Sequence, residues 1–99
     1  METLQVANTI RQQLIAFGQV KVWSWGARQW VGGSNFLQFR VSGHHFKGRI
    51  KITLNSMDLY DIQFIKLSGE VHNEVNGVYF DQMTDIIDRV VERIEAYKH

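Results

Sequence analysis

The stretch FLQFRVSGHHFKGRIKITLNSMDLYDIQFIKL, residues 36–67, decides the fold of this chain. It contains three runs in which apolar and polar residues alternate, and a period of two is typical of a half-buried strand. Short connections separate the runs, and residues 55–58 have the composition of a hairpin loop. We therefore expect three antiparallel strands in a meander. The alternation breaks after Phe64, which predicts a bulge there or a second buried face.

One face of this meander is predicted to be apolar and the other basic. The residues predicted to point inward are Leu37, Phe39, Val41, Phe46, Ile50, Ile52, Leu54, Tyr60, Ile62 and Phe64. The outward residues include Arg40, Arg49 and Lys51, with Lys47 nearby and Asp61 as the acid of that face. An ordinary solvated surface and a patch that meets phosphates or an acidic protein surface both remain open interpretations.

Patterns with helical periodicity stand at both ends of the chain. The first covers residues 4–17, and its apolar stripe is Leu4, Ala7, Ile10, Leu14 and Phe17; Gly18 suits the left-handed stop of a helix. The last is predicted to begin with Asp81 as its cap, and its stripe is Met83, Ile86, Ile87, Val90, Val91, Ile94 and Tyr97. An acidic ridge follows its polar side, through Asp81, Asp85, Asp88, Glu92 and Glu95. This ridge is either a solvated helix face or a docking surface for a basic partner.

Residues 19–31 are predicted to form a further strand with a bend at Gly26, and residues 32–35 are a turn. Two interpretations of its three tryptophans remain open. The indoles either cap the open edge of a small core, or Lys21, Trp23 and Trp25 point outward together and offer a stacking surface.

Residues 70–80 are predicted to form a second hairpin. Its turn would be Asn76-Gly77, because this dipeptide between alternating residues is a strong hairpin signal.

Composition limits the class of protein. Ninety-nine residues with 44% hydrophobic residues predict a single domain, 1–99, with one core. The chain has no cysteine, no apolar run of membrane-spanning length and no signal-peptide block, so we expect a cytoplasmic protein that does not enter a membrane. Residues 1–51 carry seven bases and one acid, whereas residues 52–99 carry four bases and nine acids. This asymmetry bears on partners rather than on fold.

The sequence contains no recognisable catalytic or metal-binding motif. His44 and His45 are adjacent and would point to opposite faces of a strand, while His72 and His99 are isolated. No phosphate-binding glycine loop and no serine elbow is present. We therefore expect no enzyme, no metal and no cofactor.

Four short segments carry a resemblance to a known group. They are residues 25–28 (WGAR), residues 46–48 (FKG) with Ile50 and Ile52, residues 58–61 (DLYD) and residues 78–82 (VYFDQ). With these, the chain resembles small uncharacterised proteins of bacterial phages and conjugative elements, a group without an established activity. The resemblance implies an accessory protein that binds a host or element-encoded macromolecule.

The predicted fold is α+β: an N-terminal helix, an antiparallel sheet of four to six strands (the meander plus the hairpin) and a C-terminal helix, with both helices on one sheet face. The predicted core is Leu14, Phe17, Phe39, Val41, Ile50, Ile52, Ile62, Phe64, Ile87, Val90 and Ile94.

Two functional hypotheses follow. The first is a non-enzymatic protein-interaction module, with an unknown protein or a second copy of the chain as its partner, through the tryptophans or the acidic last helix. The second is a single-stranded nucleic-acid binder that uses a basic, tryptophan-bearing sheet face. The candidate binding residues are Lys21, Trp23, Trp25, Arg28, Trp30, Arg40, Arg49 and Lys51.

Overall fold

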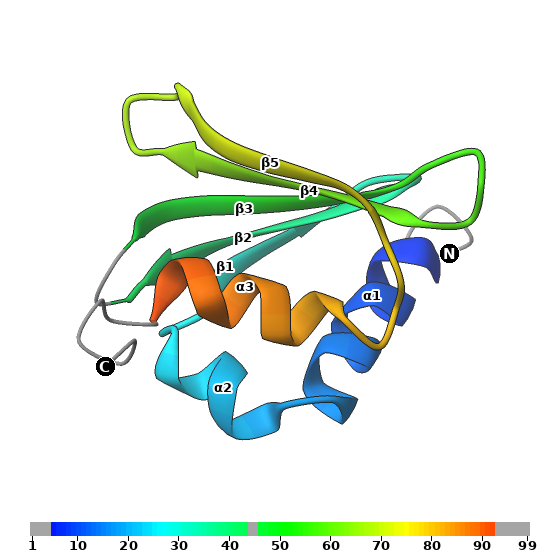
Figure 1. The fold of residues 1–99 in the computed structure, drawn as a ribbon, viewed down its shortest axis with the longest axis horizontal. Helices are drawn as coiled ribbons and strands as arrows, with labels where there is room; N and C mark the ends of the chain where they lie inside the picture. Colours follow the sequence, from blue (N-terminus) through cyan, green and yellow to red (C-terminus); the bar gives the residue numbers. More distant parts are fainter. Residues whose placement is uncertain (1–4, 44–45, 93–99) are drawn as a thin grey trace.

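A five-stranded antiparallel sheet with three helices on one side forms the fold in the computed structural model, which describes residues 5–43 and 46–92 (Figure 1). The elements in chain order are α1 (Gln5–Ala16), α2 (Gln19–Ser24), β1 (Arg28–Gly32), β2 (Phe36–Ser42), β3 (Lys47–Leu54), β4 (Tyr60–Lys66), β5 (Val71–Val78) and α3 (Met83–Val91). Each strand pairs with the next in sequence. The predicted α+β class, the meander and the placement of the terminal helices on one face are confirmed.

The central strands pair without interruption, so their apolar residues stack in rows across the sheet. Phe39 lies opposite Ile50, and Ile50 opposite Phe64. Leu37, Ile52 and Ile62 form the next row. All six are buried. The alternation read from residues 36–67 therefore places the core face correctly.

The helices close the core from one side. The buried residues of the two longer helices are Ala7, Ile10 and Leu14 of α1, and Met83, Thr84, Ile87 and Val91 of α3. The Thr84 hydroxyl donates to the Leu14 carbonyl oxygen at 2.9 Å, which ties α3 to α1. The Tyr60 hydroxyl donates to Gln13 Oε1 at 2.8 Å and so ties β4 to α1. These two bonds satisfy polar groups that would otherwise be costly to bury.

Residues 19–24 form the short helix α2 rather than a strand, so that prediction is wrong. Val22 is buried, but Val20 is 73% exposed, so the two valines do not face one way. The amides of Val22 and Trp25 donate to the carbonyls of Gly18 and Lys21, four residues back in each case. A four-residue alternation is too short to decide between helix and strand, and one buried valine is enough to anchor a single helical turn.

Gly18 connects α1 to α2 where α3 passes close by. A Cβ added there would lie 2.5 Å from Thr84 Cγ2. The Gly18 φ of 167° is extended, so the predicted left-handed stop is wrong, and the glycine is required instead by close packing where the chain turns into α2.

The predicted second hairpin is also wrong, because residues 71–78 are one strand. Gly77 has φ 67°, and its amide donates to Asp61 Oδ1 at 3.1 Å. The β4–β5 register shifts there, from Tyr60 opposite Val78 to Ile62 opposite Val75. Asn76-Gly77 thus supplies the positive φ of a bulge instead of a turn.

The turn between β4 and β5 lies earlier, at residues 67–70. It contains Gly69 at φ 97°, and the Lys66 amide donates to the Glu70 carbonyl oxygen at 2.8 Å. A second register shift lies at the step from Phe64 to Ile65, where β5 advances two residues, from Asn73 to Val71. An irregularity is therefore present near Phe64 as predicted, but its extra residue lies on β5 and not on β4.

Three details of the helices differ from expectation. Helix α3 begins at Met83 after Gln82, so Asp81 does not cap it. Phe17 is not in the core: it is 49% exposed and meets the ring of Phe80 edge-on at 5.7 Å. Val90 is partly buried against the core. The predicted positions Leu4, Ile94, Glu95 and Tyr97 lie outside the described residues.

Candidate functional site

The sheet face opposite the helices carries the cationic residues that the alternation predicted. We call it the open face, and its polar residues include Gln38, Arg40, Lys47, Arg49, Lys51 and Gln63, with Asp61 and Glu74 as acids of the same face. Strand register aligns Arg28, Arg40 and Arg49 in one row across β1, β2 and β3. Ile65 and Val71 continue this row across β4 and β5, so it contains no carboxylate on any of the five strands. The predicted grouping of Arg40, Arg49 and Lys51 on one side is confirmed.

Within the part of the chain that the structure describes, no acid lies in ion-pair contact with a cation of the open face. Within residues 5–43 and 46–92 the ion pairs are Lys21–Asp85, Lys66–Glu70 and Arg89–Asp85, none of which involves the open face. Lys51 Nζ lies 4.6 Å from the centre of the Phe36 ring. Arg28 donates to the Gly26 carbonyl oxygen at 3.0 Å. The positive charge of this face is therefore available to an anion from solution.

The acid predicted for this face is already engaged. Asp61 Oδ1 accepts hydrogen bonds from Asn55 Nδ2 and from the Gly77 amide, both at 3.1 Å. It lies opposite Thr53, whereas Lys51 lies opposite Gln63. Asp61 therefore holds the β3–β4 loop and the β5 bulge in place and does not neutralise the arginine row.

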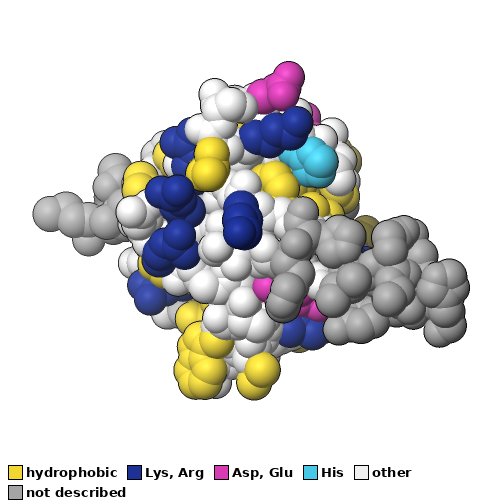
Figure 2. Space-filling view, turned by 90° about the vertical axis from the view of Figure 1, so that its left-hand side faces the viewer, with side chains coloured by type: hydrophobic (Ala, Val, Ile, Leu, Met, Phe, Trp, Pro, Cys, Tyr) yellow, Lys and Arg dark blue, Asp and Glu magenta, His cyan; other side chains and the backbone are white. Residues whose placement is uncertain are grey.

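Figure 2 faces the end of the molecule where β2 ends and β3 begins. Lysine and arginine side chains gather there over the strand ends, and hydrophobic side chains lie below them on the helical side. The strands and the helical layer thus present surfaces of different chemistry.

A pocket of about 300 Å³ opens in the cationic region, lined by Gln29, Arg40, Arg49 and Leu67. Gln29 lies in a bulge of β1, where the register shifts between Arg28 and Val31. It has φ 57°, in the left-handed region that side chains other than glycine rarely adopt. Neither Gln29 nor Leu67 could be assigned to this site from the sequence, because nothing in the residue pattern signals the β1 bulge.

The tryptophans belong to the helical side of the sheet. Trp25 is buried, and its indole Nε1 donates to Asp88 Oδ1 at 3.0 Å. Trp30 packs against Phe39 with ring centres 4.6 Å apart and ring planes tilted by 30°, and the Arg11 guanidinium lies 4.8 Å from the centre of the Trp30 ring. The prediction that Trp25 points outward beside Trp23 is wrong. The interpretation that the indoles cap the core holds for Trp25 and, in part, for Trp30.

Trp23 and Lys21 lie on α2 and also stand apart from the open face. Trp23 is 68% exposed. Lys21 pairs with Asp85 of α3 at 3.5 Å. No described tryptophan therefore lies on the basic face, and the stacking surface proposed for that face is not present.

The acidic ridge of α3 is used largely within the molecule. Asp85 pairs with Arg89 at 2.9 Å in addition to Lys21, and Asp88 accepts the Trp25 bond. These contacts hold α2, Trp25 and α3 together. They leave little of the described ridge free for a basic partner.

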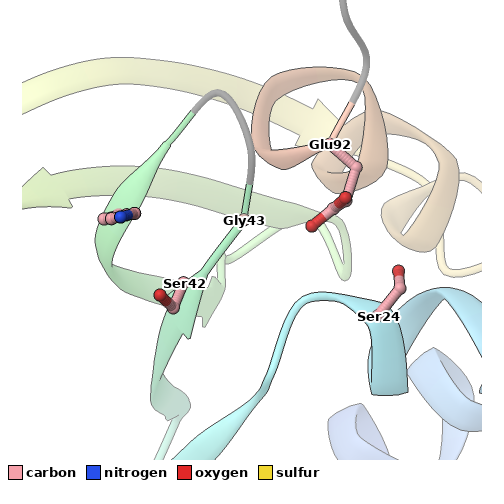
Figure 3. Close-up of a pocket in the computed structure, with 5 residues that line it drawn as sticks. Ser24, Ser42, Gly43 and Glu92 are labelled. Carbon is pink, nitrogen blue, oxygen red and sulfur yellow. The ribbon is translucent and has the colours of Figure 1, made fainter.

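A second hollow of about 340 Å³ lies between α2, α3 and the end of β2 and is lined by Ser24, Ser42, Gly43, Lys47 and Glu92. Figure 3 shows the Ser24 hydroxyl and the Glu92 carboxylate facing the same space, while the Ser42 hydroxyl points away from Glu92. Ser24 already donates to the Lys21 carbonyl oxygen at 2.7 Å. The geometry therefore does not assemble an activated serine.

The described residues contain no group of three side chains that could hold a metal ion. Burial raises the pKa of the Tyr60 hydroxyl, which lies against α1 and not in either hollow. None of the described helices is long and apolar enough to cross a membrane.

No protein-family model, curated protein or solved structure matches this chain. The function must therefore be argued from the geometry and charge of the open face.

Proposed function

We propose that this chain is a small non-enzymatic macromolecular interaction module whose open face binds the phosphates of a nucleic acid. The observation that carries the proposal is the row of Arg28, Arg40 and Arg49 across three adjacent strands, with no carboxylate in the row. Phosphate contacts by lysine and arginine supply most of the affinity in non-specific nucleic-acid binding. The expected mode is recognition of the backbone with little preference for base sequence.

Arginine is the appropriate side chain for this role. Its planar guanidinium offers five N–H donors and matches phosphate oxygens two at a time. Gln38 and Gln63 flank Lys51 in the next row and add neutral donors, and Glu74 of β5 ends that row beyond Gln63. The centre of the open face has no large exposed aromatic side chain of the kind that anchors protein–protein interfaces. This combination of cations and amides favours a polyanion over a protein surface.

The absence of indoles from the face changes the single-strand hypothesis. Base stacking on Trp23 and Trp25 no longer supports it, so nucleic-acid binding would depend on contacts to the phosphates alone. Single-stranded and duplex oligonucleotides are therefore compared in the test, and tryptophan emission is not its readout.

Fluorescence anisotropy with an end-labelled oligonucleotide of about ten nucleotides tests the proposal. The double variant Arg40→Gln/Arg49→Gln should weaken binding by about ten- to a hundredfold, because each lost charge-assisted contact corresponds to about tenfold in affinity. The control Lys21→Gln/Arg89→Gln removes the same net charge from the helical side and should bind like the parent. Absence of binding to either strand form at low salt would remove the proposal.

A protein partner on the helical side is the second candidate, and a specific observation favours it. Phe17, Val20, Trp23 and Phe80 all expose apolar surface there, with Val20 and Trp23 the most exposed of the four. A homodimer is one form of this contact. Light scattering coupled to size exclusion tests the homodimer: a dimer that Val20→Ser/Trp23→Ser converts to a monomer would support it, and a monomeric parent at all concentrations would oppose it.

The resemblance to proteins of phages and conjugative elements supplies the biological setting of the proposal. An accessory protein in that setting handles nucleic acid or a host protein. A cytoplasmic location is part of the same proposal, since nucleic acid is found there and the chain needs no disulfide.

A further inference from the structure

Arg40 and Arg49 form a cross-strand pair of like charge. They lie directly opposite each other on β2 and β3, and directly opposite residues on one face have neighbouring side chains. Like charges in this position oppose folding. No described carboxylate pairs with either guanidinium, so the repulsion is not relieved within this part of the chain. A bound dianion would relieve it.

Gln29 adds a neutral donor to the same pocket at a cost in backbone strain. Its left-handed φ of 57° belongs to the bulge that brings it to the pocket wall beside Arg40 and Arg49. Bulges commonly redirect a side chain toward a functional site. A residue other than glycine in this region is strained, and such strain concentrates at ligand-binding positions.

The fourth wall of the pocket is apolar. Leu67 follows β4 and is 56% exposed at the rim. Apolar surface beside the guanidiniums displaces water and strengthens their attraction for an anion. The lining that the structure describes thus has two cations, one amide, one apolar wall and no acid. By contrast, the groove on the helical side has Arg11 as its single cation, and the hollow near Lys47 includes Glu92.

The charge of the pocket indicates whether it suits a phosphodiester within a strand or a phosphate monoester at its end. A phosphodiester inside a strand carries one negative charge, whereas a phosphate monoester carries about −1.5 to −2 at pH 7 and presents three terminal oxygens. Two adjacent guanidiniums match the dianion in charge and in donor number. We propose that the pocket of Gln29, Arg40, Arg49 and Leu67 binds the terminal phosphate of a nucleic-acid strand. This inference rests on the proposed function and names one subsite within the open face.

Oligonucleotides of one sequence that differ only in their ends provide the test. One carries a 5′-phosphate, one a 3′-phosphate and one hydroxyls at both ends, with the dye attached within the strand. The parent protein should bind one phosphorylated strand about tenfold or more tightly than the hydroxyl-ended strand. Inorganic phosphate at millimolar concentration should remove that preference, whereas sodium chloride of the same ionic strength should leave most of it.

Variants separate the end-phosphate site from the rest of the open face. Arg49→Gln should abolish the preference for a phosphorylated end. Lys51→Gln, its matched control outside the pocket, should weaken binding of all three strands in parallel and leave the preference intact. Thermal unfolding of both variants checks that they fold.

The possible results distinguish the end-phosphate site from the proposed function. Equal affinity of the parent for all three strands would overturn the end-phosphate site and leave the proposed function standing. No binding of any strand would overturn both. A preference that survives Arg49→Gln would place the end phosphate elsewhere and overturn this inference.

Discussion

Trp25 donates its indole N–H to the Asp88 carboxylate across 3.0 Å, although 63 positions separate the two residues in the chain. The contact joins the end of α2 to α3 on the helical side of the sheet. It explains why a tryptophan that alternation placed at the surface is instead buried. It also gives one residue of the acidic ridge a structural role.

Removing the acceptor of that bond should destabilise the fold. In Asp88→Ala the buried indole N–H loses its partner, and the expected loss is about 1–3 kcal/mol in the free energy of unfolding. Asp85→Ala is the control: it removes the surface pairs to Lys21 and Arg89, and exposed pairs of this kind contribute at most about 1 kcal/mol. Urea unfolding measures both. Equal losses in the two variants would contradict the role assigned to Asp88.

The two neighbouring tryptophans should respond very differently to truncation. Trp25→Ala opens a cavity in the core and should cost about 3–5 kcal/mol, whereas Trp23→Ala should change stability by less than about 0.5 kcal/mol. The reason is burial, because Trp25 is fully enclosed and Trp23 lies mostly in solvent. Chemical unfolding of the pair, with Trp25→Phe as a milder variant, provides the measurement. A large loss in Trp23→Ala would show that its ring is packed in solution.

The like-charge pair of Arg40 and Arg49 should destabilise the fold and, at the same time, strengthen the binding of nucleic acid. Arg49→Thr removes the repulsion across the strands and should stabilise the fold by a few tenths to about 1 kcal/mol beyond Lys51→Thr. Both substitutions introduce the same residue on β3, so the difference between them isolates the like-charge contact. The same Arg49→Thr variant should bind oligonucleotide more weakly than the parent. If Arg49→Thr is no more stable than Lys51→Thr, the two guanidiniums do not repel each other significantly.

Stability should fall at alkaline pH partly through Tyr60. Burial raises the pKa of its hydroxyl above the unfolded value near 10, the bond to Gln13 opposes this shift, and Asp58 adds to it. A raised native pKa contributes stability that is complete below the unfolded pKa and is lost as pH rises through the native pKa. The parent should therefore lose more stability than Tyr60→Phe as the pH rises from about 9 through the unfolded pKa near 10 and beyond it. Unfolding free energies of the two proteins across that range test this, and parallel curves would exclude Tyr60.

The sheet could be predicted because, along each long strand, the alternation of apolar and polar residues matches the alternation of buried and exposed side chains. Within each of β2, β3 and β4, from Leu37 to Phe64, inward and outward residues alternate along the strand, and one register therefore satisfies every pair. The direction of Arg40, Arg49 and Lys51 followed from the same alternation. Where the signal covers a whole strand, a shift by one residue would expose the entire core face, so little ambiguity is left.

The incorrect predictions concern segments in which a short sequence pattern is compatible with two different backbone structures. Val20 and Val22 alternate over too few residues to exclude a helical turn, and Asn76-Gly77 supplies a positive φ that suits a bulge as well as a turn. The pocket depends on Gln29, whose left-handed backbone arises from the pairing of β1 with β2. No local residue preference marks such a position in advance.

The salt dependence of oligonucleotide binding is the decisive measurement of phosphate binding through the open face. We expect log Kd to change linearly with log salt concentration, and Arg40→Gln/Arg49→Gln to reduce the slope by about 1.4, since each phosphate contact contributes about 0.7 on a single strand. The charge-matched Lys21→Gln/Arg89→Gln should keep the parental slope. Equal slopes in the two double variants would contradict binding through the open face.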